Sequence, residues 1–274
     1  MTKNLLTRSS RYALILLVSF AALTFGQTTQ TARELGSRTA KNGFKNETEI
    51  AAKFNNWKVD LDARDWIRTL GYEIDKVKSI EATKPHGEKS DVLVKIKTAS
   101  GEFSEGISIK LVSSENGFNQ IDKRWLSHYA RMWNMPDDVL SALKLFLGEV
   151  TPNGKSRRPE RMYFNELDEN SRSAVLRFFT DNREQIVSDL FEGDGIYKAK
   201  WLMVAQKKSK TQRWVLRRIR DAASFFANGK VELTRNGNLK IGRITMQRKG
   251  GDGGRESAKM LQFKINPALL FETK

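Results

Sequence analysis

Asp91, Ser108 and Lys110 are the residues whose types and spacing most suggest a chemical reaction. Residues 108 and 110 are two apart, so on a strand their side chains project from the same face. A carboxylate on a neighbouring strand can hold Mg²⁺ beside a phosphodiester, and the carbonyl oxygen of Ile109 can supply a further ligand. Lys110 can lower the pKa of the attacking water or stabilise the charge that develops on the phosphate. The pattern predicts metal-dependent phosphodiester hydrolysis; a solvated strand face is the alternative interpretation.

Two alternating segments must position these residues. Residues 90–98 (SDVLVKIKT) and 106–113 (GISIKLVS) alternate apolar with polar residues, and residues 99–101 supply a turn between them. Asn46 is predicted to begin a helix before this hairpin, with Glu49 in the capping-box position. Further helices are expected over residues 63–70, 120–133, 136–147, 166–179, 182–191 and 213–226, and further strands over residues 201–206, 230–234, 239–248 and 260–265, the second and third of these strands joined by the turn Asn236-Gly237. This order indicates a mixed α/β chain of one domain or of two closely packed lobes.

The composition excludes several classes of site. The 274 residues include no cysteine, which rules out disulfides, a zinc ribbon and a thiol nucleophile. The two histidines, His86 and His128, lie too far apart in the sequence for a zinc helix of the H-x-x-x-H type. Any metal is therefore expected to be a hard cation held by oxygen, with Mg²⁺ the best candidate.

The positive charge is concentrated in one part of the chain. Lys and Arg number 48 against 32 Asp and Glu, a net charge of +16. Residues 198–255 alone hold sixteen basic and three acidic residues, a net charge of +13. An excess of this size predicts a polyanionic partner, either nucleic acid or an anionic membrane surface.

Longer stretches of the chain resemble the type II restriction endonucleases that recognise GCGC. In that group the nuclease core is of the PD-(D/E)-x-K type and carries Ser-Asp followed by Gln-x-Lys. The similar stretches are residues 34–47 (ELGSRTAKNGFKNE), 109–113 (IKLVS), 117–125 (GFNQIDKRW), 204–207 (VAQK), 242–252 (GRITMQRKGGD) and 260–265 (MLQFKI). The resemblance runs in register from about Leu35 to Phe271. It implies a restriction-endonuclease-like core with a central mixed sheet flanked by helices.

The resemblance also implies which residues form the active site. Ser90, Asp91 and Lys110 fall on the active-site positions of the family, with Asp91 and the Ile109 carbonyl as metal ligands. Ser108 falls where the family has Gln, so a water is expected to fill the space left by the shorter side chain. Either Glu47 or Glu49, in the first helix, is a candidate for an additional carboxylate.

Two segments are candidates for DNA recognition. They supply Asn119, Gln120 and Lys123, which follow the hairpin, and Gln247, Arg248, Lys249 and Asp252, which enter a glycine-rich loop. Arg can pair with guanine O6 and N7, and Asp can accept from cytosine N4. The same loop would also suit phosphate binding without base reading. The nuclease core is expected mainly within residues 44–135 and the recognition portion mainly within residues 198–265 of a domain that spans 35–274.

The resemblance implies a Mg²⁺-dependent endonuclease that cuts double-stranded DNA at GCGC. It further implies cleavage after the first G with a two-base 5′ overhang, and a cytosine methyltransferase as functional partner. A homodimer is one way to cut both strands, and no membrane partner is expected. Two other functions stay open: an exported, less specific nuclease, and an inactive DNA-binding protein, which the Ser108 departure would favour.

Residues 1–34 form a signal-like extension. Lys3, Arg8 and Arg11 precede a mostly apolar stretch over residues 12–25, as in a secretory signal peptide. A restriction enzyme meets foreign DNA in the cytoplasm, which conflicts with export. The resemblance begins near Leu35, so we expect an extension from translation of an upstream start, with a genuine export signal as the alternative.

Overall fold

The computed structural model describes residues 37–38, 41–195, 197–208, 211–251 and 255–272. The chain divides at Phe44 into two units, and the second unit, residues 45–274, holds all the strands described below. The signal-like extension expected over residues 1–34 lies outside the described residues. Within the described part of the chain, no helix has the length and apolar character needed to cross a membrane.

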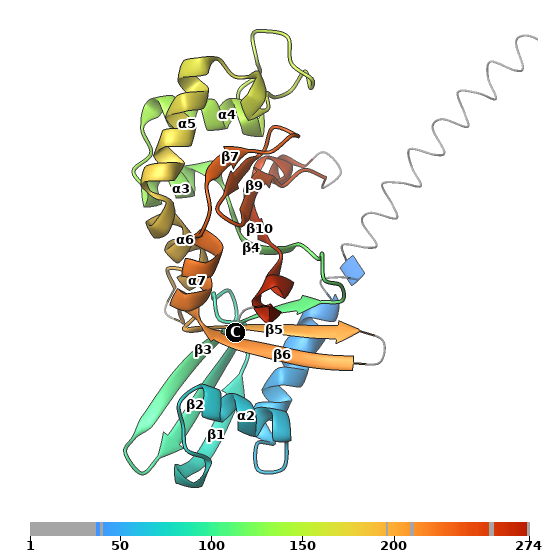
Figure 1. Cartoon of the computed structure of the whole chain (residues 1–274), viewed down its shortest axis with the longest axis vertical. Coiled ribbons are helices and arrows are strands. Elements are labelled where there is room, and N and C mark those ends of the chain that lie inside the picture. The colour runs from blue at the N-terminus through green and yellow to red at the C-terminus, as the bar shows by residue number, and fades with distance from the viewer. Residues whose placement is uncertain (1–36, 39–40, 196, 209–210, 252–254, 273–274) are drawn as a thin grey trace, which may run out of the picture. The chain divides into compact units, whose positions relative to one another are not determined.

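The first sheet has five strands in the order β1-β2-β3-β5-β6 (Figure 1). Its strands are β1 (Val77–Thr83), β2 (Val92–Thr98), β3 (Glu102–Val112), β5 (Trp201–Lys208) and β6 (Thr211–Arg218). Only β3 and β5 run parallel, and the other neighbours are antiparallel. The predicted central mixed sheet is therefore confirmed.

This first sheet separates two hydrophobic cores. Ile107 and Ile109 of β3 lie in the smaller core, together with residues 50–54 of the helix that ends at residue 55 and with helix α2 (Leu61–Thr69). Because side chains alternate along a strand, Ser108 and Lys110 lie on the opposite face, which is the face of Val112 and the larger core. The alternation that the sequence shows over residues 106–113 is the alternation between these two faces.

The second sheet is antiparallel and has the strand order β4-β10-β9-β8-β7. Its strands are β4 (Asn119–Arg124), β7 (Val231–Leu233), β8 (Leu239–Ile241), β9 (Ile244–Arg248) and β10 (Leu261–Ile265). Phe263 and Ile265 of β10 belong to the same large core as Leu202 and Val204 of β5. The shared core fixes the second sheet relative to one face of the first sheet.

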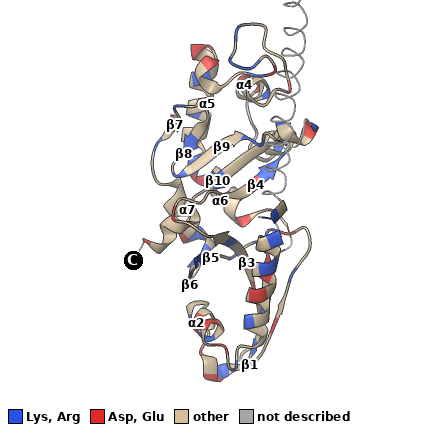
Figure 2. Cartoon of the chain, turned by 90° about the vertical axis from the view of Figure 1, so that its right-hand side faces the viewer, with Lys and Arg blue, Asp and Glu red and all other residues tan. Residues whose placement is uncertain are grey.

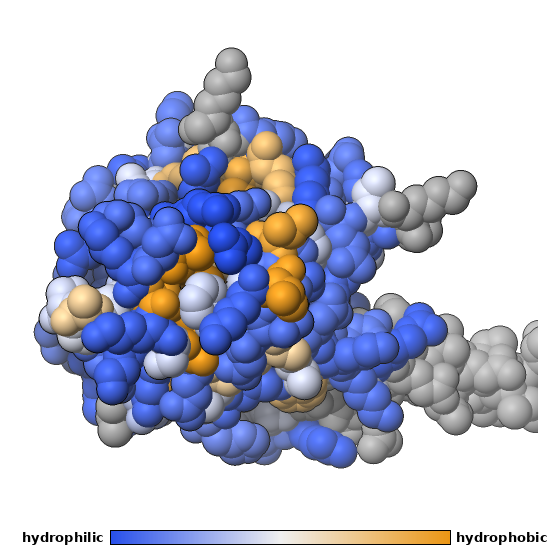
Figure 3. All heavy atoms as spheres, turned by 90° about the horizontal axis from the view of Figure 1, so that it is seen from below, coloured by the Kyte–Doolittle hydropathy of each residue, from blue (hydrophilic) through white to orange (hydrophobic). Residues whose placement is uncertain are grey.

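Helices along one side of the second sheet complete the large core (Figure 1). They are α3 (Leu126–Met132), α4 (Asp137–Leu147), α5 (Glu169–Asp181), α6 (Arg183–Glu192) and α7 (Ile219–Ala227). Short 3₁₀ helices occur at Ile74–Lys76, Phe164–Glu166, Glu256–Lys259 and Pro267–Phe271. Seen from below, the surface is mainly hydrophilic, and apolar side chains show over only part of that face (Figure 3).

Two predicted helices were partly wrong. Residues 119–124 form strand β4, and the helix begins only at Leu126; residues 211–218 form strand β6, and the helix begins only at Ile219. In both cases a partner distant in sequence decides the structure, since β4 pairs with β10 and β6 pairs with β5. A short amphipathic segment does not reveal such a partner.

Two boundaries also differ from the prediction. Asn46 does not begin a helix; it lies inside the helix over residues 41–55, and its side chain is buried. The strand expected over residues 239–248 is divided into β8 and β9 at Gly242, whose φ is +56°. A Cβ at Gly242 would come 2.5 Å from the carbonyl oxygen of Ala227, so the close approach to α7 requires glycine there.

The sheets also cut across the two expected sequence ranges. Strands β5 and β6, which lie in the basic portion over residues 198–265, complete the first sheet with the hairpin β2–β3. Strand β4, which lies within residues 44–135, belongs instead to the second sheet. Each sheet is thus built from strands of both halves of the chain.

Candidate active site and nucleic-acid interface

The structure brings Asp91, Ser108 and Lys110 together. The Asp91 amide donates to the Ile107 carbonyl at 2.9 Å, which places Asp91 opposite Ser108 at the mouth of the hairpin. The Asp91 carboxylate accepts the Ile109 amide at 2.6 Å and the Ser108 hydroxyl at 3.3 Å through one oxygen, Oδ2. Lys110 Nζ lies 3.4 Å from the Ser108 hydroxyl oxygen. These bonds hold the carboxylate in one orientation on the face of the sheet that the larger core shares.

Ser90 has a different environment from its neighbour. It is fully buried, and its hydroxyl donates to the carbonyl oxygens of Tyr197 and Lys198 at 2.9 and 3.1 Å. Gly106 lies opposite, where a Cβ would come 2.3 Å from the Ser90 hydroxyl oxygen and 2.4 Å from the Lys198 carbonyl oxygen. These hydrogen bonds fix the start of β2 against residues 197–198, so Ser90 positions Asp91 through the backbone.

Glu47 brings a second carboxylate into the electrostatic environment of the hairpin. Its pKa is raised above the usual range by burial and by the negative charge of Asp91, against the lowering effects of Lys84 and Lys110. Lys84 Nζ lies 3.0 Å from the Glu47 carboxylate. The other candidate, Glu49, forms a 2.6 Å ion pair with Lys207 of β5 instead. Of the two glutamates, Glu47 is the one that interacts with the proposed catalytic residues.

The donor set fits a hard divalent cation. Burial, and to a smaller degree the negative charge of Asp91, make ionisation of Glu47 unfavourable, and a cation bound by Asp91 would oppose both effects. The available ligands are carboxylate and carbonyl oxygens, which Mg²⁺ prefers. Among the described residues no group of three or more His, Cys, Asp or Glu side chains is close enough to form a metal cage, so water would complete the coordination.

Three glutamines form a row of amides across the second sheet. Gln262 of β10 donates to Gln120 of β4 at 2.7 Å and accepts from Gln247 of β9 at 3.3 Å. Gln262 is buried, whereas Gln120 is exposed. Sequence reasoning selected Gln120 and Gln247 and missed Gln262, although one polar residue in the apolar strand MLQFKI was a signal for it. Gln262 fixes the two outer amides in a single register.

The other predicted recognition residues are spread around this row. Lys123 is paired in register with Gln262, and Asn119 lies at the far end of β4 opposite Ile265. Arg248 follows Gln247, yet it donates through Nε to the Leu147 carbonyl at 2.8 Å, away from the amide row. Lys249 Nζ lies 3.4 Å from the Ser257 hydroxyl, and Asp252 lies outside the described residues.

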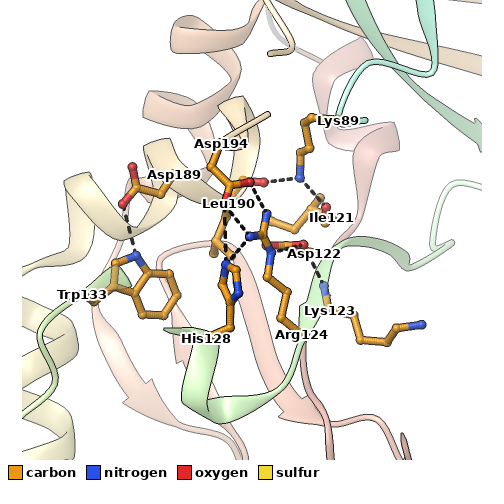
Figure 4. Close-up of polar contacts among 10 residues, drawn as sticks. All are labelled: Lys89, Ile121, Asp122, Lys123, Arg124, His128, Trp133, Asp189, Leu190 and Asp194. Carbon is orange, nitrogen blue, oxygen red and sulfur yellow. Dashed lines mark hydrogen bonds and ion pairs between the residues drawn. The ribbon is translucent and has the colours of Figure 1, made fainter. Parts of the chain in front are cut away.

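A polar cluster joins the hairpin to strand β4 (Figure 4). The half-buried Lys89, two residues before Asp91, donates to the carbonyl oxygens of Ile121 and Leu190 at 2.7 and 2.5 Å. Burial lowers the pKa of Lys89 to about 8, against the raising effect of Asp122. Lys89 was not among the residues predicted from the sequence, because nothing local indicates that it contacts residues 121 and 190.

Arg124 is the centre of the same cluster. Its guanidinium donates to both carboxylate oxygens of Asp194, at 2.8 and 3.0 Å, and to Asp122 at 3.1 Å. Arg124 lowers the pKa of Asp194 to about 2. The Nε2 atom of His128 lies 3.5 Å from the Asp194 carboxylate, in the same cluster (Figure 4). This network ties β4 to the segment that follows α6.

A family model for the R.HinP1I restriction endonuclease matches residues 70–271, which is most of the chain. The chain belongs to the R.HinP1I restriction endonuclease family. It is therefore a restriction endonuclease, a hydrolase that acts on DNA. A comparison with curated proteins found no match.

The fold of this R.HinP1I family member also resembles a solved structure. The crystal structure of restriction endonuclease MspI in complex with its cognate DNA matches with a TM-score of 0.54 and 12% identity, over 80% of this chain and 83% of that chain. At this identity the likeness shows the fold alone. It confirms the restriction-endonuclease-like fold that the sequence predicted.

Proposed function

We propose that this family member hydrolyses double-stranded DNA at GCGC with Mg²⁺ as cofactor. The observation that carries the catalytic part is the convergence of Asp91, Ser108 and Lys110 on one face of the first sheet, joined by hydrogen bonds. The resemblance of the longer stretches to GCGC-cutting enzymes supports the sequence of the site. It also supports cleavage after the first G, with a two-base 5′ overhang.

Asp91 and the Ile109 carbonyl would hold the metal, with Glu47 as a further carboxylate. Mg²⁺, when bound, supplies positive charge beside the phosphate and makes water more acidic. Lys110, held near the Ser108 hydroxyl, would donate to a phosphate oxygen and stabilise the charge that builds up there. The oxygen of water attacks phosphorus, the bond to O3′ breaks, and the products are a 5′-phosphate and a 3′-hydroxyl.

Ser108 would act as a neutral partner of both charged side chains. Its hydroxyl lies 3.3 Å from Asp91 and 3.4 Å from Lys110, so it bridges the carboxylate and the ammonium. A hydroxyl can accept from Lys110 and donate to Asp91 at once. This bridging keeps the two catalytic side chains near each other without a second strand carboxylate.

The second sheet would read the bases. Gln120 and Gln247, fixed by Gln262, would offer amide donors and acceptors to the bases. The other candidate residues lie near these glutamines in the sheet or in the sequence: Asn119, Lys123, Arg248, Lys249 and Asp252. An amide or guanidinium that makes two bonds to one base discriminates by about 1–3 kcal/mol. Gln120, exposed at the start of β4, is the member best placed to reach between bases.

The test is a digest of plasmid DNA by the purified full chain with and without Mg²⁺. Discrete fragments whose sequenced ends fall in GCGC, with two-base 5′ overhangs, are expected only when Mg²⁺ is present. Fragments with ends at another sequence would overturn the GCGC assignment, and a smear would indicate the less specific nuclease.

A parallel digest with Asp91→Ala tests the active site. This variant should shift labelled DNA in a gel without cutting it. Cutting at the wild-type rate would overturn the assignment of Asp91. A wild-type chain that shifts DNA but never cuts it would favour the inactive DNA-binding protein.

The partners follow from the same proposal. A cytosine methyltransferase would protect host GCGC sites, so plasmid methylated at those cytosines should resist the digest. One chain carries one set of Asp91, Ser108 and Lys110, and a homodimer on DNA would supply a second set for the opposite strand. Sedimentation of Asp91→Ala with a short GCGC duplex distinguishes one bound chain from two.

A further inference from the structure

A basic pocket lies beside β9, the strand that carries Gln247. It has a volume of about 380 Å³ and is lined by Arg157, Arg161, Tyr163, Asn236, Asn238, Gln247 and Arg248. Figure 2 shows basic residues along the loop between α4 and α5, from which the first two arginines come. Every lining residue is polar or charged, and none is acidic.

The two loop arginines are held on either side of one aromatic ring. The guanidinium carbons of Arg157 and Arg161 each lie 4.1 Å from the Tyr163 ring centroid. Arg157 donates to Glu166 and Asn165, whereas Arg161 donates through Nη1 to the Phe146 carbonyl at 3.3 Å. The other N–H groups of the stacked Arg161 guanidinium can bind a phosphate. The stack therefore orders two cations that an ordinary surface loop would leave mobile.

The backbone around the stack is fixed at several points. The amide of Met162 donates to the Leu145 carbonyl at 3.0 Å, and the amide of Phe164 donates to the Gly237 carbonyl at 3.0 Å. Gly237 has φ +76°, and a Cβ there would come 2.7 Å from Tyr163 Cβ and 2.8 Å from Arg157 Nη2. The turn between β7 and β8 thus packs directly against the stack, and the pocket is built from three segments distant in sequence.

The charge of the pocket is only partly neutralised. Arg157 forms a 3.1 Å ion pair with Glu166. Among the residues that the structure describes, neither Arg161 nor Arg248 has a carboxylate within ion-pair distance. Burial, and the positive charge of Arg248, hold the pKa of Arg161 below its ordinary value. Two neighbouring guanidiniums without an acid between them favour an anion.

We propose that Arg161, with Arg157, binds a backbone phosphate of the DNA next to the nucleotide that Gln247 of β9 reads. Gln247 lines the same pocket, so a phosphate there would belong to the strand that passes the amide row. A phosphodiester anion complements the guanidiniums better than a base edge does, because a base offers acceptors without charge. The inference rests on the proposed DNA-binding function and adds residues outside both predicted recognition segments.

The experiment measures DNA binding by the full chain in an Asp91→Ala background, which separates binding from cutting. Arg161→Gln is compared with the background protein on a GCGC duplex and on a scrambled duplex of equal length, over a range of salt concentrations. We expect roughly tenfold weaker binding to both duplexes. The slope of log K against log salt concentration should fall by about 0.9. The matched control is Arg177→Gln, a change at an exposed residue of α5, and it should leave affinity and slope unchanged.

Two further measurements guard against a loss of folding. Arg157→Gln changes a more exposed member of the stack and should also reduce the salt slope. Methylphosphonate substitutions, placed one linkage at a time in the GCGC duplex, should weaken binding of the background protein at a linkage where they no longer affect Arg161→Gln. A thermal melt shows whether each variant is folded.

The outcomes separate the inference from the function beneath it. Weaker binding to the GCGC duplex alone, with an unchanged slope, would overturn phosphate binding and indicate base reading. Affinity and slope equal to those of the background protein in both arginine variants would overturn phosphate binding in the pocket. Specific binding of the GCGC duplex by the background protein would still support the proposed DNA-binding function. A background protein that binds neither duplex would overturn the proposed function itself.

Discussion

The two five-stranded sheets differ in how their faces are used. In the first sheet, β5 is buried from Trp201 to Gln206, because cores cover both of its faces. In the second, β8 and β9 bury alternate residues in the large core and leave the rest partly open to solvent. A sheet packed on both faces holds Asp91, Ser108 and Lys110 with little freedom, which suits a reaction that needs a fixed geometry. A sheet open on one face can present polar side chains to a long ligand.

The polar groups of the two sheets differ in the same way. Charged groups dominate at the hairpin, where Asp91, Lys110 and Glu47 interact. Neutral amides dominate on the second sheet, where Gln262 links Gln120 and Gln247. Charges stabilise a developing transition state, whereas amides distinguish bases by donor and acceptor pattern. Changes in the first sheet are therefore expected to affect the cleavage rate, and changes in the second sheet are expected to affect sequence specificity.

The largest effect is expected for Asp91→Asn in the first sheet. The isosteric amide keeps the shape but removes the charge that the metal requires, so cleavage should fall by about a thousandfold or more. Affinity for a GCGC duplex should change little. Single-turnover cleavage and fluorescence anisotropy measure the two quantities. A parallel loss of affinity would break the separation between the sheets.

Gln262→Leu in the second sheet should have the next largest effect. It removes the hydrogen bonds that join Gln262 to Gln120 and Gln247, each worth about 0.5–1.5 kcal/mol. Discrimination between GCGC and sites with one altered base should fall roughly tenfold to a hundredfold, while binding to scrambled DNA stays constant. Gln212→Leu, an exposed change on β6, is the control. Unchanged discrimination would contradict the role of the amide row.

Lys89→Met tests the junction between the sheets. The change removes two hydrogen bonds to the backbone of residues 121 and 190 and is expected to loosen β4 relative to the hairpin. We expect about a tenfold lower cleavage rate with a small change in affinity. Lys95→Met, exposed on β2, should cut at the wild-type rate. Wild-type cleavage by Lys89→Met would mean that the sheets keep their relation without this contact.

The smallest effect is expected for Asp194→Asn at the edge of the same junction. Arg124 lowers the pKa of Asp194 to about 2, below its value in the unfolded chain, so this ion pair stabilises the fold above about pH 4 and loses its effect as the pH falls toward 2. Asp194 is more than half exposed, so the gain should stay below about 1 kcal/mol. Thermal melts should show a lower Tm for the variant at pH 6 and a smaller gap at pH 3. A gap that grows as the pH falls would contradict the assignment.

The hairpin and the contacts among Asp91, Ser108 and Lys110 were predictable because their information is local. Alternation over residues 90–98 and 106–113 indicated two adjacent strands, and the spacing of Ser108 and Lys110 placed both on one face. The structure shows the hairpin and the contacts among Asp91, Ser108 and Lys110. The mixed α/β class followed from the same periodicities.

The second sheet was much less predictable, because its pairs are distant in sequence. Nothing near residues 119–124 indicates that they pair with residues 261–265, so an amphipathic segment was assigned to a helix. Gln262 gains its place from two neighbours, Gln120 and Gln247, that only the folded sheet brings to it. Lys89 gains its two acceptors only because the fold brings Leu190 of α6 and Ile121 of β4 to it.

The sequence by itself determined the residue types, the local hairpin and the concentration of positive charge between residues 198 and 255. Local spacing sets which side chains share a strand face, so these features needed no partner. The tertiary structure alone decided that β5 and β6 complete the first sheet, that Glu49 pairs with Lys207 while the charge of Asp91 acts on Glu47, and that Arg161 and Arg248 line one pocket. Each of these depends on packing between segments far apart in the chain, where burial and charge act through space rather than along the sequence.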